Sequence, residues 1–187
     1  MIIETAAIIF NKKGVAGTSI DDVLQAAKIA KGCLYGHFEN KDALAYATVD
    51  YLMEKVAKQA TGLIEGQETA KGKLFAFMEL YKNPLESFVD GGCPILNFGV
   101  ESDDTDLVIK RKVRSIIGMT NKVLEDVIRT GIEKGELSPK MDAEQFPAKM
   151  LATMEGGMFV SRIFESNSRM DGILDMLKAE IEQYELS

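Results

Sequence analysis

The sequence predicts an all-α fold, with an amino-terminal three-helix domain that contains a helix-turn-helix and a larger helical domain after it. Apolar residues recur at spacings of three and four along most of the chain, which is the period of a helix buried on one face. The second half shows no strand signal. Near the amino terminus a short amphipathic helix, a tight turn and a second short helix follow one another, an order typical of a helix-turn-helix. With 187 residues, of which 46% are hydrophobic, the chain can bury a sizeable core.

Capping residues define the first two helices. The first helix is expected over residues 2–13, and Gly14 is expected to end it in a left-handed conformation. Ser19 is the expected N-cap of the second helix, because Asp22 follows it at the spacing of a capping box. The turn after this helix is placed at Lys28.

A third helix is expected over residues 30–38, and its composition suggests that it faces DNA. Leu34 and Phe38 are four residues apart and would anchor it to its own domain. The rest of the helix forms a small, polar, open face: Lys31, Gly32, Cys33, Tyr35, Gly36 and His37. A fourth helix is expected from Lys41 to about residue 60.

The remaining chain is predicted to be helical. We assign residues 1–46 to a helix-turn-helix DNA-binding domain and residues 47–187 to a helical regulatory and dimerisation domain. Further helices are expected over residues 73–89, 105–134, 143–165 and 170–184, and a short apolar helix or turn over residues 95–100. Pro84 is expected to kink or break the first of these helices, because proline cannot donate the backbone hydrogen bond.

The charge distribution bears on whether DNA is a partner. A net charge of -7 argues at first against nucleic acid, since contacts to phosphate supply much of the affinity of DNA-binding proteins. However, residues 1–58 carry seven Lys and seven Asp or Glu, whereas residues 59–187 carry 15 basic and 22 acidic side chains. An acidic second half would leave the amino-terminal face as the surface that DNA can approach.

Several classes of protein are disfavoured by composition. No apolar run reaches the roughly 20 residues of a membrane span, and no signal peptide is evident, so we expect a cytoplasmic protein with no membrane partner. Cys33 and Cys93 lack the spacing of a disulfide framework or a zinc site. His37 is the only histidine, and no carboxylate or thiol is arranged to use it. We therefore expect no enzyme, no catalytic residues, no metal site and no cofactor.

About a dozen positions in the first 50 residues agree in order and spacing with one known family. They are Thr5-Ala6 to Phe10, Gly14, Thr18-Ser19, Asp22-Val23, Gly32, Leu34-Tyr35, His37-Phe38 and Lys41-Asp42-Ala43-Leu44. In these residues the chain resembles the amino-terminal domain of the TetR family of bacterial transcriptional regulators. It departs from the family at Lys28, where glycine is usual, at Ala30, where a Ser or Thr cap is usual, and at Cys33, where Thr is frequent.

This resemblance implies a double-stranded DNA operator as partner and a set of contacting residues. The set is Thr18, Lys31, Gly32, Cys33, Tyr35, Gly36, His37 and Lys41. Lys31 and Cys33 would influence which bases are preferred, whereas Thr18 and Lys41 would clamp the flanking DNA backbone. An ordinary solvated helix face is the alternative reading of the same spacing.

The second half resembles the regulatory domain of the same family, through the Gly-Gly-Cys-Pro run that ends at Pro94 and the Glu101 that follows it. That resemblance implies a homodimer in which the last two helices pair with their copies as a four-helix bundle. The predicted interface residues are Met154, Gly157, Val160, Phe164, Ile173, Leu177 and Ile181. The two helices also carry more apolar surface than one intramolecular contact can cover.

Eight of the ten methionines lie in the second half, which suggests a flexible apolar cavity. We predict an effector site for a bulky apolar or aromatic molecule, lined by Phe75, Met78, Tyr81, Cys93, Phe98, Met119, Val123, Met154 and Met158. Plain core packing is the alternative for these methionines. Effector binding is expected to shift the fourth helix as a lever and so to change the spacing of the two DNA-facing helices.

Together these patterns predict a DNA-binding transcriptional regulator. The most specific form of the prediction is a repressor that binds a palindromic operator as a homodimer and is released by a small apolar or aromatic ligand. One alternative is a regulator that senses oxidants or electrophiles through Cys93, although inert packing is the default for a cysteine among apolar residues. The other is a helical interaction protein that has lost DNA binding, favoured by the neutral first domain and the unusual turn at Lys28.

Overall fold

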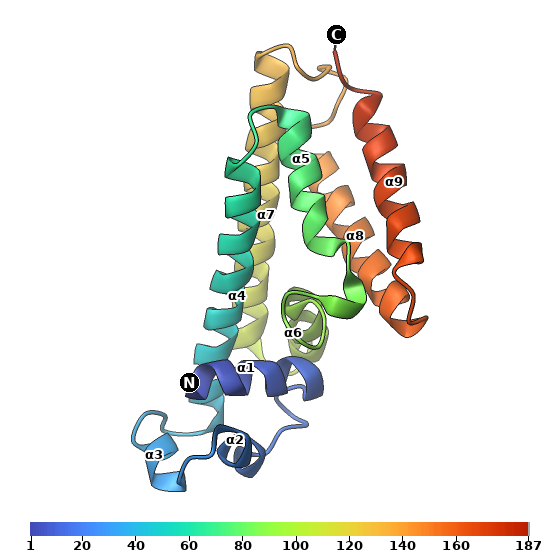
Figure 1. Ribbon diagram of the computed structural model, residues 1–187. Coiled ribbons are helices and arrows are strands. Elements are labelled where there is room, and N and C mark those ends of the chain that lie inside the picture. The colour runs from blue at the N-terminus through green and yellow to red at the C-terminus, as the bar shows by residue number, and fades with distance from the viewer. Residues whose placement is uncertain (187) are drawn as a thin grey trace. The chain divides into compact units, whose positions relative to one another are not determined.

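A computed structural model describes residues 1–186, which form nine α-helices (Figure 1). The helices are α1 (Ile2–Lys13), α2 (Ile20–Ala27), α3 (Lys31–Tyr35), α4 (Lys41–Glu65), α5 (Ala70–Met78), α6 (Pro94–Ser102), α7 (Leu107–Glu133), α8 (Gln145–Ile163) and α9 (Ser168–Glu182). Over the same residues the extended structure is limited to an isolated bridge between Leu137 and Glu185, so the predicted all-α class is confirmed. None of these helices is both long and apolar enough to cross a membrane.

Most helix boundaries agree with the predictions, with two differences. The helix α3 ends at Tyr35 and is shorter than the expected span to Phe38. The expected helix over residues 73–89 is broken: α5 ends at Met78, and two 3-10 turns follow, η1 (Glu79–Tyr81) and η2 (Pro84–Glu86). Pro84 cannot donate to an α-helical hydrogen bond, and it begins η2 instead, at a position where no donor is needed.

The chain divides into two compact units that do not follow the order of the sequence. The first unit contains residues 1–56 and 89–116, and therefore α1 to α3, α6 and the first parts of α4 and α7. The second unit contains residues 57–88 and the described residues from Ile117 on, and therefore α5, α8, α9 and the remainders of α4 and α7. Residues 89–116 thus group with the amino-terminal helices, whereas the predicted boundary after residue 46 stays a prediction.

The core of the first unit forms where the apolar faces of its helices meet. Its buried side chains include Phe10, Val23, Leu34, Leu44, Leu52 and Phe98. Leu34 is completely buried, as its spacing predicted, and fixes the short α3 to the helices beside it. The helix α6 lies next to α1 (Figure 1). Each large apolar side chain buried in this way contributes about 1.5–3 kcal/mol relative to exposure.

The second unit is organised by the packing of α8 along α9. Its buried side chains include Leu74, Met78, Leu124, Ile128, Met150, Met154 and Leu177. Gly157 permits the close approach of the two helices, because a Cβ atom there would lie 2.7 Å from Cδ1 of Ile173 and 2.9 Å from Sδ of Met170. Any larger residue at position 157 would force these side chains apart.

Candidate nucleic-acid interface

The entry to α2 is fixed by a capping box. The Asp22 amide donates to Oγ of Ser19 at 3.1 Å, and the Ser19 amide donates to Oδ2 of Asp22 at 2.8 Å. These reciprocal bonds satisfy two amides that the first turn of a helix leaves without partners. The hydrogen bonds from the Ser19 hydroxyl and amide lower the pKa of the Asp22 carboxyl below its ordinary value. The predicted cap of α2 is confirmed.

The turn between α2 and α3 is left-handed at Lys28, with φ 54° and ψ 43°. The Lys28 amide donates to the carbonyl oxygens of Leu24 and Gln25, which closes the end of α2. A side chain in this conformation costs about 1 kcal/mol more than glycine. Ala30 then precedes α3 without a side-chain cap. The helix therefore depends on the burial of Leu34 for its position.

The outer surface of α3 and of the two residues that follow it, which we call the α3 face, consists of Lys31, Gly32, Cys33, Tyr35, Gly36 and His37. All six residues are exposed. A Cβ atom added at Gly32 would meet nothing within 4 Å, so the backbone there is open to a close approach. The Lys31 ammonium lies 5.8 Å from the centre of the Tyr35 ring. The α3 face thus offers donors from a lysine, a tyrosine and a histidine on a small surface.

The two residues predicted to clamp the DNA backbone beside this face already have partners within the protein. The Thr18 hydroxyl donates to the carbonyl oxygen of Gly14 at 2.7 Å, and its side chain is buried. The Lys41 ammonium donates to the carbonyl oxygen of Thr18, also at 2.7 Å. Both side chains therefore hold the loop that leads into α2, and their contacts with DNA stay predictions.

A second set of polar contacts joins the end of α1 to residues 90–101, and the sequence analysis did not find it. Asn11 is 97% buried, and its Nδ2 donates to the carbonyl oxygens of Asp90 at 2.8 Å and of Gly92 at 3.0 Å. The Glu101 carboxylate accepts from the amides of Val15 at 2.9 Å and Ala16 at 2.8 Å. The signal in the sequence was Asn11 itself, a polar residue on the apolar side of an amphipathic helix.

The Lys12 ammonium adds an exposed ion pair to this set, at 2.9 Å from Oδ2 of Asp90. This hydrogen bond and the charge of the ammonium lower the pKa of the Asp90 carboxyl. Exposed pairs of this kind contribute little to stability, so the buried amide of Asn11 is the stronger part of the contact.

The predicted effector residues are distributed over both units. Cys93 and Phe98 belong to the first unit, and the other seven belong to the second. In the second unit Met78, Met154 and Met158 are buried, and the Tyr81 hydroxyl donates to Oε1 of Glu155 at 2.9 Å. Their role in binding an effector stays a prediction.

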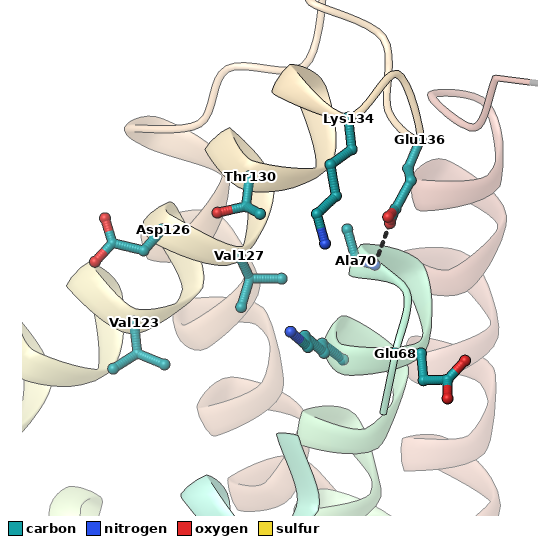
Figure 2. A pocket seen from close by; sticks show the side chains of 9 residues that line it. Glu68, Ala70, Val123, Asp126, Val127, Thr130, Lys134 and Glu136 are labelled. Carbon is teal, nitrogen blue, oxygen red and sulfur yellow. Dashed lines mark hydrogen bonds between the residues drawn. The ribbon is translucent and has the colours of Figure 1, made fainter. Parts of the chain in front are cut away.

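The second unit has a cleft of about 300 Å³ between the start of α5 and the last turns of α7 (Figure 2). It is lined by Glu68, Ala70, Lys73, Val123, Asp126, Val127, Thr130, Lys134 and Glu136, so Val123 is the one predicted effector residue among them. Figure 2 shows the Lys134 side chain directed into the cleft and the carboxylates of Glu68 and Asp126 directed away from it. Glu136 closes one side by accepting from the Ala70 amide at 2.6 Å.

Six of the seven predicted dimer residues fall into two groups, and Ile173 is intermediate in exposure. Met154, Gly157, Leu177 and Ile181 are buried within the second unit, where they help to pack α8 on α9. Val160 and Phe164 are exposed, as are further large apolar side chains of the same two helices. We call this exposed set the α8–α9 stripe: Phe159, Val160, Ile163, Phe164 and Met176, which are 37–66% exposed. Exposed large apolar side chains of this kind are typical of a protein–protein interface.

Comparisons with known proteins agree with this arrangement. The family described as "Bacterial regulatory proteins, tetR family" matches residues 2–48, and the family described as "Tetracyclin repressor-like, C-terminal domain" matches residues 70–177. The crystal structure of a TetR transcriptional regulator from Chloroflexus aurantiacus is 34% identical and has a TM-score of 0.95, over 100% of this chain and 95% of that one. The crystal structure of a TetR-family regulator from Cytophaga hutchinsonii is 33% identical and has a TM-score of 0.91, over 100% of this chain and 94% of that one. The transcriptional repressor DhaR from Mycobacterium sp. strain GP1 is 20% identical over 94% of this chain and 88% of its own.

Proposed function

Because this chain belongs to the TetR family of bacterial transcriptional regulators, we propose that it is a repressor that binds an inverted-repeat operator as a homodimer and releases it when a small molecule binds. It is a DNA-binding transcriptional regulator and not an enzyme. The observation that carries the proposal is the α3 face, an exposed polar surface on a helix whose position is fixed by Leu34. The similarity to DhaR, which is named a transcriptional repressor, supports repression as the sign of regulation.

The proposed contact places the α3 face in the major groove. Lys31 and Cys33 would face base edges, and Tyr35 and His37 would donate to phosphate or bases. Gly32, where an added Cβ atom would meet nothing within 4 Å, allows the backbone to approach the groove closely, and Gly36 is exposed beside it. Both ends of α2 are held by hydrogen bonds, so the helix that precedes α3 is rigid before DNA binds.

The proposed homodimer uses the α8–α9 stripe. A second copy would cover Ile163 and Phe164, whose side chains are 66% and 59% exposed. Two α3 faces related by a two-fold axis would then read two half-sites one or more helical turns apart. The buried members of the predicted interface would support the stripe from within the second unit.

The proposed effector is a bulky apolar or aromatic molecule that binds in the second unit and shifts α4. Support comes from the apolar, methionine-rich core around Met78, Met154 and Met158. Coupling requires that the ligand bind the DNA-free conformation more tightly than the DNA-bound one. A ligand that raises the thermal midpoint but leaves operator affinity unchanged would refute this part of the proposal.

The test is selection of bound duplexes from a random DNA pool by the purified protein, with and without reductant. We expect enrichment of an inverted repeat, and affinity for it that falls steeply with salt. Lack of enrichment at low salt would refute DNA recognition and would favour a protein-interaction role. Loss of binding on oxidation that persists in Cys33→Ser, which lacks the exposed thiol of the α3 face, would favour the alternative switch at Cys93, a residue that is only 8% exposed.

A further inference from the structure

We propose that Glu101 and Asn97 of α6 are positioning residues for DNA recognition, because they hold the end of α1 and the loop into α2 in the orientation from which α3 projects. The proposal rests on the proposed function, since it concerns how the α3 face is presented to an operator. All residues involved belong to the first unit. None of them lies on the α3 face, and the proposal assigns them no contact with DNA.

Glu101 binds the loop through its backbone. Its two carboxylate oxygens accept one hydrogen bond each, from the Val15 amide at 2.9 Å and from the Ala16 amide at 2.8 Å. Gly14 makes room for this contact, because a Cβ atom there would lie 2.8 Å from Oε1 of Glu101. The combination of φ 76° and ψ 163° at Gly14 is also one that essentially only glycine adopts. Two charge-assisted bonds to adjacent amides fix both the position and the direction of the loop.

Asn97 binds the last turn of α1. Its Nδ2 lies 3.0 Å from the carbonyl oxygen of Asn11, 3.1 Å from Oδ1 of Asn11 and 3.1 Å from the carbonyl oxygen of Gly91. Asn11 in turn donates to the carbonyl oxygens of Asp90 and Gly92. The two amide side chains therefore join α1, the Gly91-Gly92 turn and α6 in one partly buried network. Such a network keeps a single geometry when all its groups are satisfied.

The loop from Gly14 to Thr18 is consequently held from two helices. Glu101 of α6 holds its first amides, and Lys41 of α4 holds the carbonyl oxygen of Thr18 at its end. A cavity of about 220 Å³, lined in part by Val15, Lys41 and Glu101, adjoins both contacts. The Glu101 carboxylate therefore has space to leave its amides. Displacement of α6 would thus change the loop that leads into α2, in addition to any movement of α4.

Removing the Glu101 charge should change operator affinity in opposite directions, depending on whether Glu101 acts by positioning the loop or only by its charge. Glu101→Gln keeps the length of the side chain but leaves one oxygen for two amides. Loss of a negative charge alone would strengthen binding to DNA. We expect the variant instead to bind the selected operator about tenfold more weakly, since one charge-assisted hydrogen bond to the loop is lost. Asp104→Asn is the matched control. It removes the same charge, at an exposed residue that has no bond to the loop.

The experiment measures operator affinity by fluorescence anisotropy at fixed salt, and amide hydrogen exchange by NMR, for the wild type and both variants. We expect Glu101→Gln to accelerate exchange at Val15 and Ala16 while core amides such as that of Leu44 stay protected. General destabilisation would accelerate exchange at all three amides. Equal operator affinity of Glu101→Gln and Asp104→Asn, or unchanged exchange at Val15 and Ala16, would overturn the proposal. If the wild type selects no operator, the proposed function fails, and the exchange result still decides whether Glu101 holds the loop.

Discussion

The α3 face and the α8–α9 stripe are both exposed, but they differ in chemistry. The α3 face is small and polar, with Tyr35 as its one large hydrophobic side chain, and so it offers little apolar area to a partner. The stripe offers two phenylalanines, an isoleucine, a valine and a methionine. Binding at the first surface must therefore depend on charge and hydrogen bonds, and binding at the second on burial. The difference implies that salt should weaken DNA binding much more than self-association.

The largest effect is expected from a charge placed in the stripe. Ile163→Glu would bury an unpaired carboxylate in the proposed dimer, because Ile163 is its most exposed member. We expect the dimer dissociation constant to rise about 100-fold or more, as for truncation of a central interface residue. Sedimentation velocity at several protein concentrations measures this change.

Leu107→Glu is the control for that substitution. Leu107 is 67% exposed at the start of α7, in the first unit and outside the stripe. The variant makes the same chemical change at an equally exposed residue and should remain dimeric. If Ile163→Glu also remains dimeric, the stripe is not the interface.

A smaller effect is expected on the α3 face. Lys31→Ala should weaken operator binding about tenfold and alter the preferred bases, because a lost base contact costs about 1–3 kcal/mol. Lys41→Ala should weaken binding to DNA of every sequence by the same factor, because it frees the loop that the Lys41 ammonium holds and removes any contact with phosphate. Competition between operator and random duplexes measures both effects. Lys140→Ala, an exposed lysine of the second unit, controls for the loss of one positive charge, and equal losses for all three variants would refute the division of roles.

Features set by neighbouring residues could be predicted from the sequence, and features set by distant residues could not. The Ser19–Asp22 capping box and the burial of Leu34 follow from spacings of three and four, and both are confirmed. The partners of Asn11 and Glu101 lie 79–86 positions away, so no local pattern specifies them. For the same reason the grouping of residues 89–116 with the amino-terminal helices was not predicted.

The predicted dimer residues show a second limit of sequence patterns. The helix α8 is apolar on more than one side, so periodicity identifies apolar positions but not which of them turn inward. Met154 packs within the second unit, whereas Ile163, nine residues or about two and a half turns further on, is exposed. Only the packing of α8 on α9 separates the two groups.

The turn at Lys28 provides a test of local strain near the α3 face. Lys28→Gly should raise the free energy of unfolding by about 1 kcal/mol, because glycine adopts a positive φ without steric cost. This corresponds to an increase of roughly 2–4 °C in the thermal midpoint for a chain of this size. Glu165→Gly is the matched variant, since Glu165 is the other non-glycine residue with positive φ in the described chain. Both substitutions should be stabilising, but only the Lys28 variant should affect DNA binding. A lower thermal midpoint for Lys28→Gly would show that the Lys28 side chain stabilises the protein by more than its positive φ costs.

The smallest effect concerns the cap of α2 and depends on pH. Hydrogen bonds from Ser19 lower the pKa of the Asp22 carboxyl in the folded protein, whereas the unfolded chain has the ordinary value. The stabilisation is therefore complete above the ordinary carboxyl pKa and is lost as the pH falls through the lower folded pKa. Ser19→Ala removes the hydroxyl bond to the Asp22 carboxylate but keeps the backbone amide that also donates to it, so the difference between the thermal midpoints of wild type and variant should be largest near neutral pH and should narrow as the pH falls through the folded pKa. Asp21→Asn should leave this pH dependence intact, because Asp21 takes no part in the capping box. A difference between wild type and Ser19→Ala that does not change with pH would mean that the Asp22 carboxylate contributes nothing to the cap, which would leave the Ser19 hydroxyl alone to fix the helix that carries the α3 face.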